Sequence, residues 1–387
     1  LLRKDLRNNT TLLQFLNFNE LRIFSTAPGQ HNAITLFQKG VNLNKNLRSV
    51  ESKSSGIISQ SKFSNIVYGF DNNSTYFSIS QNEIYDGEEA YIRFKGLHGE
   101  NETLRHIYEK FSGCPRLDSL AHVRQGLRTG IDKISDSHRK KFKTNHSKGQ
   151  GVFIVTDSEK KSKSLNAEIV KKLYKNSDIS HYFVAENSKK NILYIDKNLS
   201  EQKFKSSYSN EYKHLENFES LIRQIRGKNN EALNDWYTLD RPREHWIFES
   251  EKVVAPQRAK SNKFGYSNND FYASADVYFI IPFDRRINSK YLTILLNSSL
   301  YYFWFYNRGK RKGEMLELYQ QPLSEALILI HDDLEVFIKY FDRLYENRTN
   351  QVAIKNLRFE IDIAIFKFFG FTFEEVGIIA PKIVEIL

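Results

Sequence analysis

A chain of 387 residues is long enough for two or three domains with buried cores, and its 40% hydrophobic and 27% charged residues predict a soluble globular protein rather than a disordered tail. Its single cysteine excludes an internal disulfide framework and a multi-cysteine zinc site. The 57 lysines and arginines outnumber the 46 acidic residues and give a net charge of +11, which suggests nucleic acid as a partner; a solvated lysine-rich surface is the alternative.

The first hundred residues are predicted to be the end of an α/β unit that needs neighbours to close its core. The chain starts Leu1-Leu2, without a methionine or a signal segment, so we expect a fragment of a longer protein. In chain order we expect a helix over Arg3–Leu16, strands over Leu21–Phe24 and Ala33–Phe37 joined by a turn at Thr26–Gly29, a polar loop over 41–62, strands over Asn65–Tyr68 and Thr75–Ile79, and a helix over Leu104–Phe111.

Residues 116–283 hold most of the remaining strand-like runs, and the chain beyond Pro322 is predicted to be helical. The most apolar stretch, Tyr291–Tyr306, is interrupted by polar residues and is too short to span a bilayer. Thr372 and Glu375 have the spacing of a capping box, and Gly370 can end the preceding helix. We expect strands over Ser119–Arg124, Val152–Val155, Asn191–Ile195, Lys252–Ala255 and Ala275–Ile281, and helices over Ala167–Leu173, Asn217–Ile225, 289–304, Leu334–Tyr345, Gln351–Phe369 and Phe373–Leu387.

The first candidate binding segment is the turn after the strand at Ser119–Arg124. Its two glycines let the backbone approach a bulky partner, and its cations can meet phosphates. Residues 121–180 hold 14 Lys and Arg against 6 Asp and Glu, so this sixth of the chain carries most of the net charge. A structural hairpin would also account for the glycines. The candidate DNA-binding residues here are Arg124, Gln125, Gly126, Arg128, Thr129 and Lys133.

Two further cationic segments are candidates. Beyond the strand that ends at Pro256, the side chains of Gln257, Arg258 and Lys260 project, and Gln and Arg can read base edges; a loop after a buried strand is the alternative. The six aromatic residues Tyr301–Tyr306 are better explained by core packing than by base stacking. They run into a flexible loop suited to phosphate contacts, with Arg308, Lys310, Arg311 and Lys312.

No catalytic or metal site is predicted. The chain has no Gly-x-Gly-x-x-Gly and no Pro-Pro, and therefore no Asn/Asp-Pro-Pro-aromatic tetrapeptide. Glu159-Lys160-Lys161 and Glu211-Tyr212-Lys213 match half of a nuclease site, but such triplets arise by chance in a lysine-rich chain. The ten histidines lack the spacing of a metal site.

Several short motifs in one order resemble the C-terminal part of TaqI-like and type IIG restriction–modification adenine-specific DNA methyltransferases. The resemblance covers roughly residues 115–380. The motifs are the Gln-Gly…Thr-Gly…Lys turn at Gln125–Lys133, Trp246 with the strand Lys252–Pro256 (valine standing for the family's isoleucine), Asp276–Ile280, Leu295–Ser299, Arg358–Asp362 and Phe369–Glu375. Phe24–Ala27 and Ala33–Leu36 are similar to the last strands of the family's methyltransferase domain.

The resemblance implies an α+β chain: the tail of a Rossmann-like methyltransferase sheet with a linker at 1–112, a mixed α/β target recognition domain at 113–330, and C-terminal helices at 331–387. It implies sequence-specific recognition of double-stranded DNA. In this reading Arg128, Gln257 and Arg258 read bases, and the loop after the aromatic run contacts phosphates.

The resemblance also implies a cytoplasmic protein with an upstream methyltransferase or nuclease portion. The family's catalytic motif and its S-adenosylmethionine site should lie upstream, so no cofactor is expected in this chain, although the intact parent would bind S-adenosylmethionine. Whether the chain acts as an enzyme is left open. The alternative is a nucleic-acid-binding or assembly subunit without a methyltransferase parent.

Overall fold

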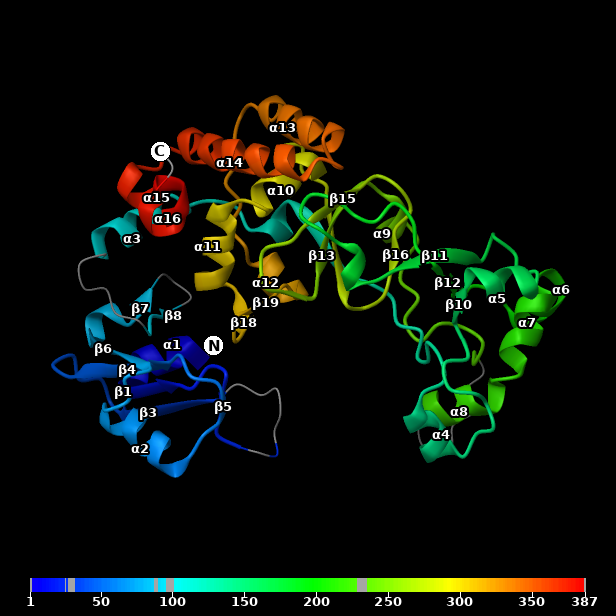
Figure 1. Cartoon of the computed structure of the whole chain (residues 1–387), viewed down its shortest axis with the longest axis horizontal. Coiled ribbons are helices and arrows are strands. Elements are labelled where there is room, and N and C mark those ends of the chain that lie inside the picture. The colour runs from blue at the N-terminus through cyan, green and yellow to red at the C-terminus, as the bar shows by residue number, and fades with distance from the viewer. Residues whose placement is uncertain are drawn as a thin grey trace. The chain divides into compact units, whose positions relative to one another are not determined.

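The computed structural model, which describes residues 2–24, 26, 32–86, 90–94, 101–227 and 235–385, is a mixed α and β structure with several small sheets (Figure 1). This confirms the predicted fold class at the level of mixed α and β elements. The chain forms two compact units: Leu1–Lys110 with Arg311–Met315, and Phe111–Lys310 with Leu316–Leu387. Most of the predicted turn at Thr26–Gly29 lies outside the described residues.

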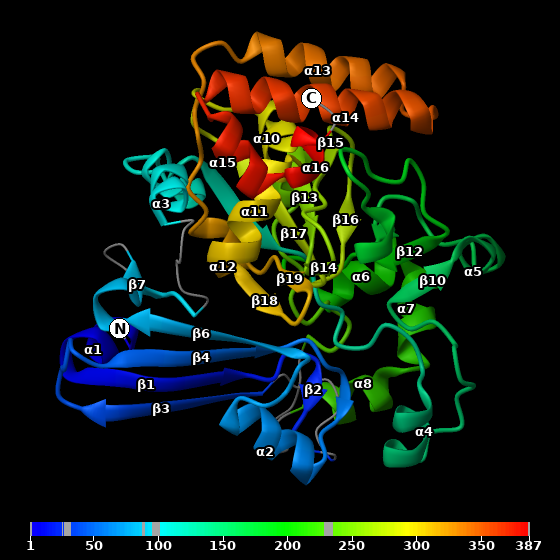
Figure 2. The ribbon, with the colours of Figure 1, turned by 60° about the vertical axis from the view of Figure 1, so that its left-hand side comes forward.

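The smaller unit is built on a four-stranded sheet of order β3-β1-β4-β6, whose strands lie side by side in Figure 2. Strand β1 pairs antiparallel with β3 and parallel with β4, and β4 pairs antiparallel with β6. The elements are α1 (Leu2–Asn9), β1 (Thr10–Asn17), β2 (Leu21–Arg22), β3 (Ala33–Lys39), β4 (Asn46–Ser52), β5 (Gly56–Ile57), α2 (Gln60–Tyr68), β6 (Ser74–Ser80), β7 (Tyr85–Asp86), β8 (Tyr91–Ile92) and α3 (Asn101–Glu109).

Three predictions for this unit are wrong. The first helix ends at Asn9, because the chain continues as β1, which buries Leu12 and Leu16 against neighbouring strands and α2. The predicted loop over 41–62 contains β4 and β5. The predicted strand at Asn65–Tyr68 is the end of α2, which the Ser59 side chain caps and Gly69 terminates at φ +93°.

The larger unit contains two four-stranded sheets, of orders β10-β12-β11-β16 and β15-β13-β17-β9. In the same unit, Arg258 and Ala259 of β14 pair antiparallel with Glu317 and Leu316 of β19. The strands of the chain from Ala121 onward are β9 (Ala121–Gln125), β10 (Ile154–Thr156), β11 (Val170–Tyr174), β12 (Lys190–Leu193), β13 (Lys252–Pro256), β14 (Arg258–Ala259), β15 (Gly265–Ser267), β16 (Tyr272–Ala273), β17 (Val277–Pro282), β18 (Lys310–Lys312) and β19 (Met315–Glu317).

The helices of the larger unit pack around these sheets. The predicted helix at Ala167–Leu173 is wrong, because Val170 and Leu173 are buried in β11 between β12 and β16. The helices are α4 (Asp136–Phe142), α5 (Asp157–Ser162), α6 (Glu201–Ser207), α7 (Ser209–Glu216), α8 (Glu219–Arg226), α9 (Trp246–Glu249), α10 (Ser289–Leu296), α11 (Ser299–Arg308), α12 (Gln320–Ser324), α13 (Glu335–Glu346), α14 (Gln351–Phe368), α15 (Phe373–Ile379) and α16 (Pro381–Val384).

Strand β13 is one of the two inner strands of the sheet that ends in β9, and it lies between β15 and β17. All five of its residues are buried, and α10 packs on it. Its first residue, Lys252, is fully buried, and its ammonium donates to the carbonyl oxygens of Phe248, Ser250 and Asn269 at 2.6–2.8 Å. A buried ammonium needs such acceptors. Burial, partly offset by nearby carboxylates, lowers the pKa of Lys252 to about 8.

The C-terminal helices follow the predicted caps. Thr372 accepts from the Glu375 backbone N–H at 3.2 Å, the Glu375 carboxylate accepts from the Thr372 N–H at 2.8 Å, and Gly370 has φ +64°. Asp362 of α14 accepts from the backbone N–H and the hydroxyl of Ser299 at 2.8 and 2.6 Å, which ties α14 to the start of α11. Within the described ranges, no helix is long and apolar enough to cross a membrane.

Acid should destabilise the protein through His181. Burial and the charges of Arg358 and Lys263 lower the pKa of His181 from 6.5 to about 4. Between these values the unfolded chain binds a proton that the folded chain does not, so stability falls as the pH drops from 6.5 toward 4, by about 3 kcal/mol at most from this residue. Urea unfolding of the protein and a His181→Gln variant across this range should give a shallower pH dependence for the variant; equal slopes would contradict the assignment.

Candidate nucleic-acid interface

The candidate interface is centred on the turn that follows β9. The antiparallel pairing of β9 with β17 ends at Gln125↔Tyr278, and the chain then crosses beside Ala273 and Ser274. Gly126 donates its N–H to the Val277 carbonyl at 2.9 Å, and the next residue donates to the Ala273 carbonyl at 3.0 Å. A Cβ on Gly126 would lie 2.3 and 2.4 Å from the Ser274 and Ala273 carbonyl oxygens, so only glycine fits this crossing.

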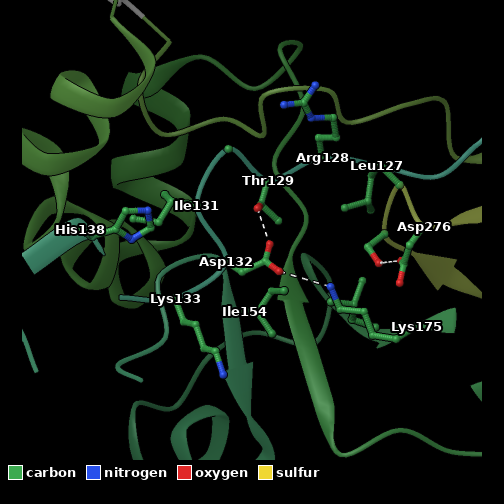
Figure 3. A pocket seen from close by; sticks show the side chains of 14 residues that line it. Leu127, Arg128, Thr129, Ile131, Asp132, Lys133, His138, Ile154, Lys175 and Asp276 are labelled. Atoms are coloured by element: carbon green, nitrogen blue, oxygen red, sulfur yellow. Dashed lines mark hydrogen bonds and ion pairs between the residues drawn. The ribbon is translucent and has the colours of Figure 1, made fainter. Parts of the chain in front are cut away.

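A cavity of about 430 Å³ lies beneath this turn (Figure 3). Thr129 and Lys175 are both directed at Asp132: the hydroxyl donates to the carboxylate at 2.5 Å, and the ammonium lies 3.2 Å from the other oxygen. Thr129 is buried and serves this contact, whereas Lys133 is exposed and its backbone pairs with Gly151. The contacts of Asp132 with Thr129 and Lys175 hold the turn in shape. The side chains of Arg128 and Lys133 are exposed to solvent.

Four arginines gather where the turn meets a distant segment, Asp240–Arg243. Arg128 and Arg241 exchange backbone hydrogen bonds at 3.0 and 2.9 Å. Arg243 donates to the Gly126 carbonyl at 3.3 Å and the Gln125 side-chain oxygen at 3.4 Å. Burial and the neighbouring guanidiniums of Arg241, Arg124 and Arg128 lower the pKa of Arg243. We name Arg124, Arg128, Arg241 and Arg243 the arginine cluster. The cluster concentrates positive charge and can bind a polyanion.

The predicted base-reading side chains are engaged with protein groups. Gln125 donates its amide to the Ala275 carbonyl at 2.8 Å. The Arg128 guanidinium lies 3.7 Å from Asp240, and Arg258 donates to Glu317 at 2.9 Å. Arg128 and Arg258 are therefore both paired with an acidic neighbour, although both side chains remain exposed. Their DNA contacts stay a prediction.

A second cationic group surrounds Glu317, whose side chain is buried. Its carboxylate receives Arg258 and also lies 3.5 Å from the Lys310 ammonium. Both cations lie over the Tyr319 ring, at 5.5 and 5.3 Å from its centre. Although burial opposes it, the hydrogen bond from Arg258 and the charge of Lys310 lower the pKa of Glu317. The side chain of Gln257 bonds to Tyr278, and Lys260 is exposed.

The prediction of a flexible loop after the aromatic run Tyr301–Tyr306 is wrong. Arg308 is the last residue of α11, and Lys310–Lys312 form β18. Tyr301, Trp304 and Phe305 are buried, which confirms core packing for part of the aromatic run. Burial lowers the pKa of Arg308 to about 10. Lys310 belongs to the larger unit and Arg311 and Lys312 to the smaller one, so the loop's four cations do not form one group within either unit.

The structure thus brings together the predicted residues of the first segment. It also brings Arg258 and Lys310 to one carboxylate, that of Glu317. Sequence reasoning missed Arg241 and Arg243, which lie outside the basic stretch 121–180 and beside acidic residues. The Arg-Pro-Arg triplet at 241–243 was the available signal. It also missed Glu317, because nothing in the sequence shows that an isolated glutamate organises two distant cations.

Comparison with known proteins finds that the chain is similar to proteins of restriction–modification systems. Residues 159–325 match the family described as the TaqI-like C-terminal specificity domain. The chain is 29% identical over 190 residues to the type II methyltransferase M.MjaIV of Methanocaldococcus jannaschii, covering 47% of this chain and 63% of that protein. These matches confirm the predicted resemblance. The turn at Gln125–Lys133 precedes the part matched by the family.

Two solved structures are similar to the chain. One is the type IIL restriction–modification enzyme MmeI in complex with DNA, with a TM-score of 0.58 and 11% identity, covering 97% of this chain and 46% of that one. The other is the type IIG restriction endonuclease BpuSI, with a TM-score of 0.39 and 12% identity over 95% of this chain and 45% of that one. The first shows a shared fold. The chain spans about half the length of these enzymes and 63% of the curated methyltransferase.

Proposed function

We propose that this chain recognises a specific sequence of duplex DNA for a restriction–modification methyltransferase that modifies adenine at N6. The family match at residues 159–325 supports DNA recognition in such a system. The single observation that carries the proposal for this chain is the arginine cluster, which lies at the Gln125–Lys133 turn and offsets few of its charges internally. Catalytic residues and the S-adenosylmethionine site are proposed to lie in another part of the parent protein.

The physical need for such a part is clear from the reaction. A methyltransferase must take its target adenine out of the duplex, which costs a few kcal/mol. Contacts elsewhere on the DNA can offset that cost and also select the sequence. We assign base reading to Arg128, Gln257 and Arg258, and phosphate contacts to the remaining predicted cations. The target recognition domain is proposed to span residues 113–330.

We also propose that the smaller unit is the end of the methyltransferase sheet. Strand β3 lies at the edge of its sheet, and all seven of its residues are exposed. Ile34 and Leu36 belong to one face and Phe37 to the other, and they are 40%, 52% and 51% exposed. A long apolar edge strand that is bare on both faces is rare in a complete sheet. This supports a partner that supplies a further strand and cover for both faces.

Mobility-shift titration of the chain with a mixed-sequence duplex tests the proposal. Binding should be measurable at 50 mM salt and roughly tenfold or more weaker at 200 mM, because several phosphates are neutralised. The chain alone should not transfer a methyl group from labelled S-adenosylmethionine. Failure to bind at low salt would contradict DNA recognition, and methyl transfer by the chain alone would contradict the assignment of catalysis to another part.

A further inference from the structure

The segment Asp240–Arg243 is bound to the DNA-facing turn although more than a hundred residues separate them in the sequence. We propose, on the basis of the proposed function, that this segment is a phosphate-binding element of the interface. Arg241 contacts the DNA backbone directly, and Arg243 is a positioning residue that holds the Gln125–Gly126 turn. Neither arginine was a candidate from the sequence.

The placement of Arg241 follows from its pairing with Arg128. The two residues exchange both backbone hydrogen bonds, so they are directly opposed, and directly opposed residues of an antiparallel pair project their side chains from one face. Two like charges at such positions repel each other. The repulsion is relieved when an anion binds between or beside them, and a DNA strand offers a row of phosphates.

Arg241 is the cation of the cluster that is best placed for an outside anion. Its side chain is exposed, and it makes no ion pair with any described residue. Arg128 shares its charge with Asp240 at 3.7 Å, and Arg243 is half-buried and donates to the turn. An arginine whose guanidinium donates to no described residue suits a phosphate, which accepts from the guanidinium through two oxygens.

Arg243 is held in an unusual backbone conformation. Its φ of +70° lies in the left-handed region, which side chains other than glycine rarely adopt. The buried hydroxyl of Tyr194 donates to the carbonyl of Pro242 at 3.2 Å and to the carbonyl of Arg243. This conformation turns the guanidinium toward Gly126 and Gln125. Strain that surrounding groups maintain is characteristic of functional sites, and here it places a cation against the turn.

The proposal can be tested with the full chain and a labelled mixed-sequence duplex. In Arg241→Ala, the slope of log affinity against log salt between 50 and 200 mM should fall in magnitude by about 0.9, the value of one lost phosphate contact. Arg241→Gln, which keeps a polar side chain, should lose the same amount. The matched control is Arg285→Ala: Arg285 is exposed, makes no ion pair with any described residue, and follows β17 at the end opposite to Gln125.

Arg243→Ala needs a second readout because it acts through the turn. Hydrogen exchange of the Gly126 and Leu127 amides, which donate to Val277 and Ala273, should accelerate in Arg243→Ala and stay unchanged in Arg241→Ala. If the wild-type chain fails to bind duplex, the proposed function fails. If it binds and Arg241→Ala keeps the slope of Arg285→Ala, the phosphate-binding element is wrong while DNA recognition stands. Unchanged exchange in Arg243→Ala would refute its positioning role.

Discussion

A Gly126→Ala variant should lose most duplex binding and about 3 kcal/mol or more of unfolding free energy. The added methyl group would lie 2.3 Å from the Ser274 carbonyl oxygen and 2.4 Å from that of Ala273, and both atoms are backbone. The chain crossing must open to admit it, which breaks the hydrogen bonds that hold the turn. Chemical denaturation and the duplex titration described above measure the two effects.

The matched control for Gly126 is Gly149→Ala. Gly149 has φ +85°, but a Cβ there meets nothing within 4 Å, so the substitution should cost only about 1 kcal/mol from backbone strain. Gly149 is not among the residues assigned to DNA contacts, so the substitution should also leave duplex binding intact. If the two variants lose the same stability, the close approach of the backbones at Gly126 is not what the site requires.

Asn297→Leu should lower the unfolding free energy by about 3–4 kcal/mol, because it leaves the buried Phe264 N–H without its acceptor and removes two further buried hydrogen bonds. Asn297 is fully engaged: its amide donates to the carbonyls of Phe264 and Thr293 at 2.7 and 2.8 Å, and its oxygen accepts from the Phe264 N–H at 3.0 Å. Phe264 is completely buried, so water cannot replace these bonds. Leucine has a similar volume, which keeps a packing defect from dominating the result.

Asn307→Leu is the control for Asn297. Asn307 lies on α11 and donates to the Phe303 carbonyl at 2.9 Å, but it is exposed, so solvent replaces the lost bond. We expect a change within about 0.5 kcal/mol. Urea unfolding of both variants measures the difference. A small loss for Asn297→Leu would mean that the backbone groups of Phe264 find other partners, and the hydrogen bonds from Asn297 would then be dispensable.

These residues show which parts of the molecule were predictable from sequence. Strands β13 and β17 were found because both read as continuous apolar runs beside a proline, and the cap at Thr372 was found because its chemistry is local. Strand β11 was taken for a helix: Val170 and Leu173 are three apart, and only the neighbouring strands β12 and β16 make an extended conformation favourable. Local patterns predicted elements where local interactions decide the conformation.

The candidate site divides in the same way. The turn at Gln125–Lys133 was predicted because its glycines and cations are adjacent in sequence. Arg241 and Arg243 were not, because only the pairing of Arg241 with Arg128 brings them to that turn. The role of Glu317 also depends on tertiary pairing, since its two cations come from β14 and β18.

The crossing at Gly126 has a consequence for anyone who would build chimeric enzymes with new specificity. The backbone of Gly126 lies close to the carbonyls of Ala273 and Ser274, and the Arg243 guanidinium donates a hydrogen bond to the Gly126 carbonyl. A transplant of residues 121–133 alone would therefore lack the backbone of Ala273 and Ser274, against which the turn packs. It would also lack Arg243, which holds the turn through a hydrogen bond. Donor and recipient must exchange three separate pieces, around 121–133, 240–243 and 273–276, as one cassette. Recombination breakpoints placed between them would separate parts that work only together.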